Sequence, residues 1–183
     1  MIERDEALNL VRKHMRNDKL IKHVLAVEAI MRGLAKRLGY DEKLWGLVGL
    51  LHDLDYEKTI NDMSRHGLLT AEIIKDILPS EAVEAIKAHN ELTGVISESP
   101  LAIALKAADQ ISGLIVATAL VMPNKKLSEV KVKSVMKKFK QKDFARNIKR
   151  EKIRLIEKLG IPLEEFVELS LNSLLEISDV LGL

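Results

Sequence analysis

The hydrophobic positions of this chain recur at the spacing of helices. Apolar residues return every three or four positions along most segments, which is the pattern of a helix with one buried face. No segment alternates strictly between apolar and polar residues, as a half-buried strand would. Capping residues, glycines and prolines place predicted helices at residues 2–16, 19–38, 42–53, 64–78, 81–90, 100–122, 128–139, 143–159 and 162–181, with a loop at 55–63.

Composition agrees with an all-helical protein. The chain has 183 residues, of which 47% are hydrophobic and only 3% aromatic. This length fits one domain of ordinary size with a real core. We predict an all-α fold with a helical core over residues 1–124 and a C-terminal helical extension over residues 125–183, packed on the same domain.

Several classes of protein are excluded by what the sequence lacks. There is no cysteine, so disulfides, thiolate metal ligands and a thiol nucleophile are ruled out. The first residues are charged rather than apolar, unlike a signal peptide. The longest charge-free run, 110–124, is too short to cross a bilayer. We therefore expect a cytoplasmic protein with no membrane partner.

The candidate chemistry begins in the predicted helix before His52 and Asp53. Residues 44–51 are almost wholly apolar and carry no charge, so this helix should lie in the core. Its end then delivers an imidazole and a carboxylate to the interior. An unpaired polar group there costs roughly 1–3 kcal/mol, and an unpaired charge costs more. A metal ion is one partner that would remove this penalty.

Other helices place titratable residues on their apolar faces as well. A single such residue would suggest a hydrogen-bonded core histidine. Several independent burial penalties are, however, a large load for a domain whose net stability is about 5–15 kcal/mol. Shared cations would remove that load, and nitrogen and oxygen ligands without sulfur suit Mn²⁺, Fe, Co²⁺, Ni²⁺, Zn²⁺ or Mg²⁺. The residues are His23, His52, Asp53, His66, His89 and Asp109.

These residues and their surroundings resemble the HD superfamily of metal-dependent phosphohydrolases. The match covers residues from about 20 to 113 and includes the stretches GLLHDLDYE, RHGLLTAEI, AIKAHNE and KAADQISGL. The tail from about residue 137 to residue 151 looks like that of a less characterised subgroup of predicted HD hydrolases. The resemblance implies an all-α fold whose core helices direct the six residues into one pocket.

The resemblance also implies specific roles. A first metal would be bound by His23, His52, Asp53 and Asp109. A second would be held by His66 and His89, with Asp53 bridging the two. The implied catalytic residues are Asp53, His66 and His89, where the two histidines complete the second site or, if it is empty, contact the substrate phosphate or protonate the leaving group. The number of bound ions, one or two, therefore remains open.

The sequence departs from the family pattern at three positions. The frequent HDIG form has glycine where this chain has Asp55, and often lysine where it has Tyr56. Members that bind two metals often have paired histidines where this chain has His89 followed by Asn90. Asp55 and Glu57 are candidates for hydrogen bonds to the metal-binding histidines, although a loop carboxylate is more often exposed.

Phosphate contacts are expected from basic residues. Residues 125–158 hold fourteen Lys and Arg against four Asp and Glu, so this segment carries the basic character of a chain with a net charge of only +2. Three roles are open for this segment: to cover the pocket mouth, to bind nucleic acid along its phosphates, or to form a solvated cationic face. The scarcity of aromatic residues argues against stacking on single strands. The candidates for phosphate contact are Lys58, Lys106, Lys140, Arg146 and Arg150.

The predicted function is hydrolysis of a small phosphorylated substrate, for which we expect a nucleotide, by a metal-dependent phosphohydrolase. It would act as a phosphomonoesterase or a phosphodiesterase through metal-activated water. A non-catalytic module that binds a metal and a nucleotide is one alternative. A nucleic-acid-binding helical protein that uses residues 125–158 is the other, less favoured alternative. The pattern leaves the oligomeric state open.

Overall fold

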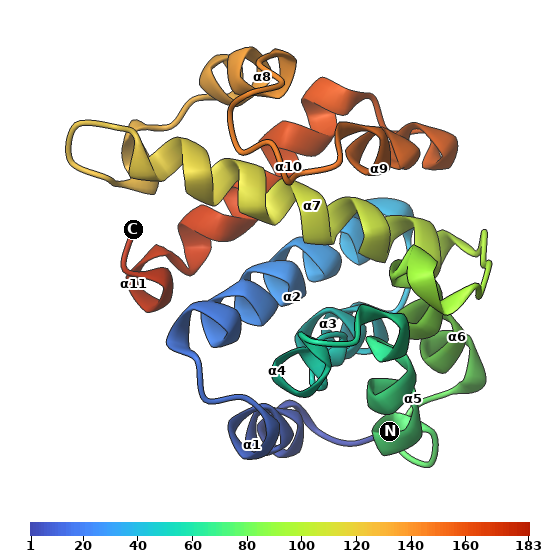
Figure 1. The fold of residues 1–183 in the computed structure, drawn as a ribbon. Coiled ribbons are helices and arrows are strands. Elements are labelled where there is room, and N and C mark those ends of the chain that lie inside the picture. Colours follow the sequence, from blue (N-terminus) through green and yellow to red (C-terminus); the bar gives the residue numbers. More distant parts are fainter.

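The computed structural model describes residues 1–183 and consists of helices, short 3₁₀ turns and loops without a strand, which confirms the all-α prediction (Figure 1). The α-helices are α1 (Arg4–His14), α2 (Asp18–Leu38), α3 (Glu42–Leu51), α4 (Tyr56–Thr59), α5 (Leu68–Ile74), α6 (Ser80–His89), α7 (Pro100–Leu120), α8 (Val132–Lys140), α9 (Arg150–Arg154), α10 (Leu163–Glu176) and α11 (Ser178–Leu181). The 3₁₀ turns are η1 (Met63–Arg65), η2 (Glu91–Thr93), η3 (Leu127–Glu129) and η4 (Leu155–Leu159).

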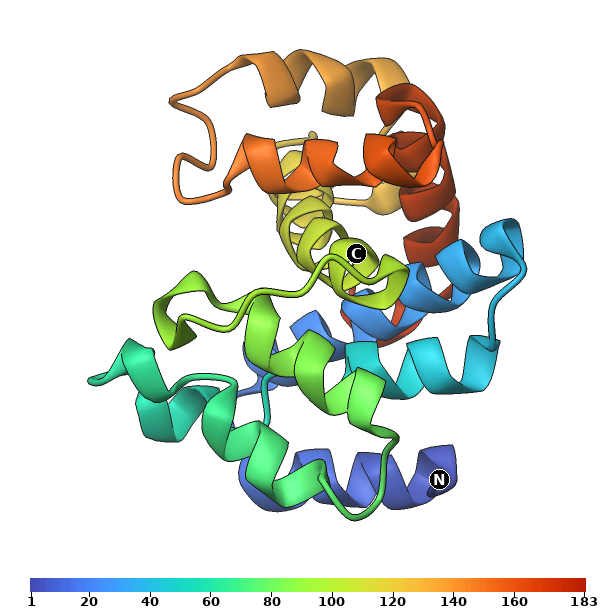
Figure 2. The same ribbon diagram turned by 90° about the vertical axis from the view of Figure 1, so that its right-hand side faces the viewer.

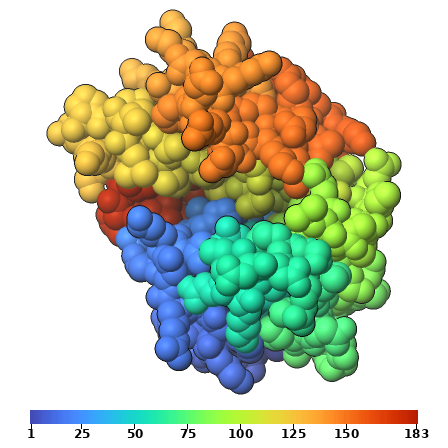
Figure 3. Space-filling model, in the orientation of Figure 1, coloured from blue at the N-terminus to red at the C-terminus, as the bar shows by residue number.

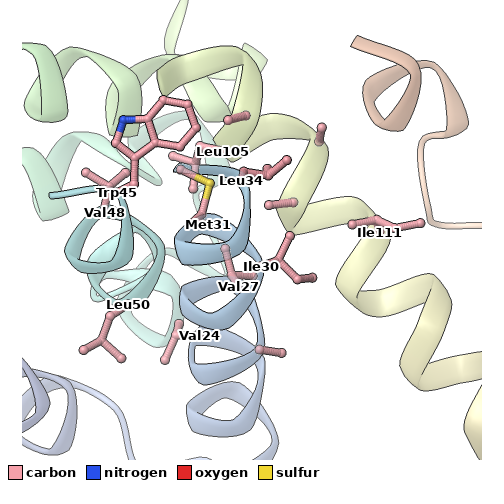
Figure 4. Packing of buried hydrophobic residues seen from close by; sticks show 14 of the residues in the cluster. Val24, Val27, Ile30, Met31, Leu34, Trp45, Val48, Leu50, Leu105 and Ile111 are labelled. Atoms are coloured by element: carbon pink, nitrogen blue, oxygen red, sulfur yellow. The ribbon is translucent and has the colours of Figure 1, made fainter. Parts of the chain in front are cut away.

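The two longest helices, α2 and α7, form the centre of the fold. They pack against each other, and α3 lies along α2 (Figure 1). Each of the three helices carries apolar residues that are fully buried, such as Ile30 on α2, Leu50 on α3 and Ile111 on α7 (Figure 4). Burial of this apolar surface is the main favourable term in folding.

The C-terminal extension shares the core of the preceding helices. Its buried residues belong to the same hydrophobic cluster as those of α2 and α7. In Figure 2 the extension packs against α7 on the side opposite α5 and α6. Examples of its buried residues are Leu127, Val135, Ile153, Ile156 and Phe166.

Helix α7 is long and apolar enough, by length and composition alone, to cross a membrane. Of its most apolar 18 residues, 67% are buried inside the protein, as expected of a central core helix.

Several predicted elements differ from the observed ones. The predicted helix at 128–139 begins at Val132, after the turn η3, and the predicted helix at 162–181 is divided at Ile177 into α10 and α11. The predicted loop at 55–63 contains the short helix α4. The predicted helix at 64–78 begins later, at Leu68, because Gly67 has a left-handed backbone with φ of 90°. In the predicted helix at 143–159, residues up to 149 form turns instead, and only α9 and η4 remain helical.

Arg150 explains why the segment before α9 is not helical. Its guanidinium group donates hydrogen bonds to six backbone carbonyls, including those of Ala145 at 2.7 Å and Ile148 at 2.9 Å. These carbonyls are satisfied without a helical ladder. Ala145 also has a positive φ of 45°, which a right-handed helix does not allow.

Gly49 permits the close approach of α3 to α2. A methyl group added there would lie 2.9 Å from the backbone of Val27 and Glu28. We expect Gly49→Ala to lower the free energy of unfolding by about 1–3 kcal/mol through overpacking. In thermal unfolding this corresponds to a fall in Tm of about 2–10 °C.

Gly46→Ala is the matched control on the same helix. A methyl group at Gly46 would meet only the flexible side chain of Arg32, so we expect a smaller loss. Equal Tm values for the two variants would contradict the packing argument.

Candidate metal centre

The last turn of α3 brings the first two predicted ligands into the core. Every residue of α3 from Trp45 to Leu51 is buried, and the side chain of Asp41 caps its first turn through the Leu44 amide at 3.0 Å. The helix ends at His52, whose exposed fraction is 0%, and Asp53 is only 5% exposed. The apolar helix therefore carries both groups inward.

The remaining predicted ligands come from four further places in the fold. His23 lies on α2, His66 between η1 and α5, His89 at the end of α6, and Asp109 in the middle of α7. His66 and His89 are buried, whereas the side chains of His23 and Asp109 are partly exposed at 25% and 20%.

Asp53 lies at the centre of the histidines. Its Oδ1 is 3.2 Å from Nε2 of His52, 3.3 Å from that of His66 and 3.4 Å from that of His89. Its Oδ2 is 3.7 Å from Nε2 of His23. The Oδ1 of Asp109 lies 3.0 Å from Nε2 of His23 and 3.8 Å from that of His52. The structure thus brings all six residues together; their roles as ligands and catalysts stay predictions.

In three of the histidines a hydrogen bond made by the ring nitrogen Nδ1 orients the imidazole ring. Nδ1 of His52 donates to the Gly49 carbonyl at 2.8 Å, and Nδ1 of His89 donates to the Ile86 carbonyl at 2.5 Å. Nδ1 of His66 lies 2.8 Å from Oδ1 of Asp55. These oxygens accept hydrogen bonds, so Nδ1 carries a proton in each ring. In its neutral form each ring therefore directs the lone pair of Nε2 toward the centre.

This arrangement fits a cation. Nε2 of His52 is buried and makes no hydrogen bond, although oxygens of Asp53 and Asp109 lie 3.2 Å and 3.8 Å away. In the neutral ring this nitrogen is an acceptor that faces other acceptors, which is an expensive state for a polar atom in the core. The Nε2 atoms of His66 and His89 are 3.0 Å apart, so two lone pairs would face each other unless a proton or a metal lies between them. Unpaired nitrogens and nearby carboxylates are the donor set of a divalent transition metal.

Two groups of three ligand atoms are compact enough for an ion. The first comprises His23, His52 and Asp109, and the second comprises His52, Asp53 and His89, with the atoms of each group within 4.8 Å of one another. Nitrogen and oxygen donors suit Mn, Fe, Co, Ni or Zn, with Mg possible. His66 lies next to the second group through its contact with His89.

Neighbouring charges in the centre shift the pKa values of its aspartates and of His66. Burial raises the pKa of Asp53 and of Asp109, but the surrounding histidines outweigh it and hold both values well below the ordinary range. Burial lowers the pKa of His66, yet its interactions with Asp53 and Asp55 raise it to about 9. Both aspartates are therefore ionised, as ligands must be.

Asp55 is a supporting residue that family comparison alone would not find. Its side chain is fully buried, and besides His66 it accepts hydrogen bonds from the backbone amides of Gly67 at 2.8 Å and Thr70 at 2.9 Å. Glu57 behaves differently: it accepts from the amides of Arg16 and Asn17 before α2 and contacts none of the histidines.

Asn90 also supports the centre. Its amide nitrogen donates to the carbonyls of Met63 at 2.7 Å and His66 at 2.9 Å. The residue at the place of a second histidine therefore fixes the backbone that carries His66.

The centre opens into a cavity of about 450 Å³. Seven residues in its wall were not predicted as site residues, namely Leu20, Tyr56, Met63, Asn90, Gln110, Asn147 and Lys152. The last two come from the extension, whose orange surface lies above the teal residues around position 60 in Figure 3. A lone lysine two residues beyond Arg150 in a basic segment offers no signal that would single it out.

The five predicted phosphate contacts do not line this cavity. Nζ of Lys58 lies 3.2 Å from Nδ1 of His14, and Nζ of Lys106 donates to the Ser97 carbonyl at 3.2 Å. Because residues 142–149 form turns rather than a helix, the other three line a separate hollow of about 390 Å³, together with Phe139 and Leu163. These three residues are Lys140, Arg146 and Arg150.

Curated relatives of this chain match about half of its length. The chain is 32% identical over 98 residues to ribonuclease Y of Oleidesulfovibrio alaskensis and 34% identical over 95 residues to that of Lawsonia intracellularis. The matches span 53% and 51% of this chain, but only 18% of either relative. Ribonuclease Y of Nitratidesulfovibrio vulgaris is 33% identical over 98 residues, with the same coverage as the first. No solved structure matches the chain significantly.

The family model for the HD domain matches residues 20–114, just over half of the chain. This range begins before His23 and ends after Asp109, so it includes all six residues of the centre. The extension lies outside it. The chain belongs to the HD domain family, as its histidines and aspartates indicated.

Proposed function

We propose that this protein is a metal-dependent phosphohydrolase that acts on a small phosphorylated substrate, for which we infer a nucleotide. The observation that supports this most is the unpartnered Nε2 of buried His52, next to carboxylates and imidazoles that line an open cavity. A volume of about 450 Å³ is within the range for small-molecule sites, about 300–1,000 Å³.

Two sets of residues would each hold a cation. His23, His52 and Asp109 would hold one cation, and Asp53 and His89 would help to hold another beside His66. A divalent cation held by these residues would make a nucleophile available from water near neutral pH and would neutralise charge on the phosphoryl oxygens. Asp53, which touches the histidines of both groups, sets the spacing of the ligands.

The surrounding chain keeps these groups in place. Asp55 orients His66, and the Gly49 and Ile86 carbonyls orient His52 and His89. If only the first group holds an ion, protonated His66 would donate a proton to the leaving-group oxygen. The burial of these rings excludes bulk water and strengthens their electrostatic interactions.

Cleavage of a phosphodiester in RNA is the second candidate. Three relatives that match about half of this chain are named ribonuclease Y. Since less than a fifth of each relative is matched, their activity is a proposal for this chain. The basic extension would favour binding to a polyanion.

A substrate screen tests the proposal. The protein is stripped with a chelator, reloaded separately with Mn, Fe, Co, Ni, Zn or Mg, and assayed on nucleotides, cyclic nucleotides, dinucleoside polyphosphates, sugar phosphates and short RNA. We expect metal-dependent turnover of a nucleotide. RNA cleavage alone would favour the second candidate, and tight nucleotide binding without turnover would favour a non-catalytic module.

Metal affinity should depend on pH. In the metal-free protein the pKa of His66 is raised to about 9, so this ring is protonated at pH 7 and must lose a proton to bind a metal. We expect the affinity for a second Mn²⁺ to rise as the pH increases from 6.5 to 8.5, by up to about tenfold per unit for each proton released.

Calorimetric titrations in buffers of different ionisation enthalpy would measure that proton release. His66→Gln is the comparison, since it lacks the titrating ring. Equal pH dependence in the two proteins would contradict the assignment of the proton to His66.

A further inference from the structure

The extension contributes one buried cation to the wall of the metal cavity. Lys152, on α9, is only 8% exposed and lines the cavity together with His66, His89 and Asp109. It lies outside the region matched by the HD family model. Burying an ammonium group is expensive unless partners satisfy its charge and its donors.

The partners of Lys152 within the protein are few. Its Nζ donates one hydrogen bond, to the His89 carbonyl at 3.2 Å. It also lies 3.5 Å from Oε1 of Glu91, whose side chain is 60% exposed and already binds Lys149 at 2.9 Å. An ammonium group has three donors. The group therefore keeps donor capacity for an anion in the cavity.

The position of this segment is fixed relative to the metal centre. The side chain of Gln110 accepts a hydrogen bond from the Lys149 amide at 2.8 Å and donates one to Oδ2 of Asp109 at 2.8 Å. Arg150 holds the preceding turns through its bonds to backbone carbonyls. The extension thus presents Lys152 to the cavity from a hydrogen-bonded frame that includes a predicted ligand.

We propose that Lys152 binds a phosphate group of the substrate, so that the extension completes the substrate site. The inference rests on the proposed function for its choice of phosphate. A compact ammonium group is a common partner of phosphate oxygens. On binding, Nζ exchanges its long contact with the exposed carboxylate of Glu91 for a hydrogen bond to the phosphate.

A purely structural role is the competing explanation. Lysine at the C-terminal end of a helix stabilises the last carbonyls, and His89 is the last residue of α6. That role predicts an effect on stability but none on the affinity for phosphate.

Binding of inorganic phosphate to the full-length, metal-loaded protein separates the two roles. We expect Lys152→Met to weaken this binding, measured by calorimetry, by about tenfold or more, as for loss of one charged hydrogen bond. For a nucleotide substrate it should raise KM with a much smaller change in kcat. Lys149→Met is the matched control, because this exposed lysine also binds Glu91 but does not line the cavity.

Unchanged phosphate affinity in a folded Lys152→Met protein would overturn the inference. If that variant does not fold, Glu91→Gln decides: loss of the competing carboxylate should tighten phosphate binding, and equal or weaker binding would overturn the inference. Lys152-dependent phosphate binding without hydrolysis of any substrate would refute the proposed function alone. Hydrolysis together with a phosphate affinity that does not depend on Lys152 would refute this inference alone.

Discussion

Asp53→Asn is expected to abolish metal-dependent hydrolysis. The carboxylate contacts four histidines, and its negative charge balances the cations that the centre would hold. Metal stabilisation of transition-state charge amounts to several kcal/mol. We therefore expect kcat to fall by about 10³-fold or more. Assays on the substrate found by the screen, together with metal analysis of the purified variant, measure both consequences.

The shape of the centre should survive this substitution. Asparagine has the size of aspartate, so circular dichroism should show a folded helical protein. Asp76→Asn, which changes an exposed carboxylate on the surface, should keep full activity and metal content. Undiminished turnover in folded Asp53→Asn would remove Asp53 from the mechanism.

Asp55→Ala is expected to have the largest effect on stability. It removes the acceptor for His66 and for the amides of Gly67 and Thr70, all within the buried interior. Buried donors without partners cost about 1–3 kcal/mol each, and broken buried charge pairs about 3–5 kcal/mol. We expect a loss of about 3–5 kcal/mol, seen in thermal unfolding as a fall in Tm of about 10–15 °C.

The same change should weaken metal binding, because His66 loses the hydrogen bond that orients its ring. Loss of such a supporting partner lowers metal affinity by about 10–100-fold. Asp62→Ala, in the same stretch but exposed, is the control and should leave Tm and affinity nearly unchanged. A wild-type Tm for Asp55→Ala would show that the observed hydrogen bonds contribute little.

Asp55 also illustrates where family resemblance misleads. The position holds glycine in the frequent HDIG form, so comparison marks the residue as a departure. In the structure it holds His66 and the first turn of α5 in place. Its role depends on a backbone bend at Gly67, which turns two amides toward the carboxylate. That bend interrupts the helix predicted for residues 64–78.

The fold class and the members of the centre followed from the sequence. Helical periodicity assigns each residue to a buried or an exposed face, and titratable groups on several buried faces need common partners. His23 and Asp109 could therefore be grouped although 86 positions separate them, and the structure places them 3.0 Å apart. The expectation that they share one pocket came from the family resemblance, because periodicity identifies which faces are apolar but not which of these faces meet.

Only the tertiary structure decided which cation reaches the cavity. In a segment with fourteen basic residues, periodicity does not distinguish Arg150 from Lys152. The choice depends on which carbonyls each side chain reaches: those of residues 138–148, shortly before it in the chain, bind Arg150, whereas His89 at the end of α6 receives Lys152. The bond of Lys152 joins segments that are far apart in the sequence, and no local pattern contains their proximity because it arises when the extension packs on α7.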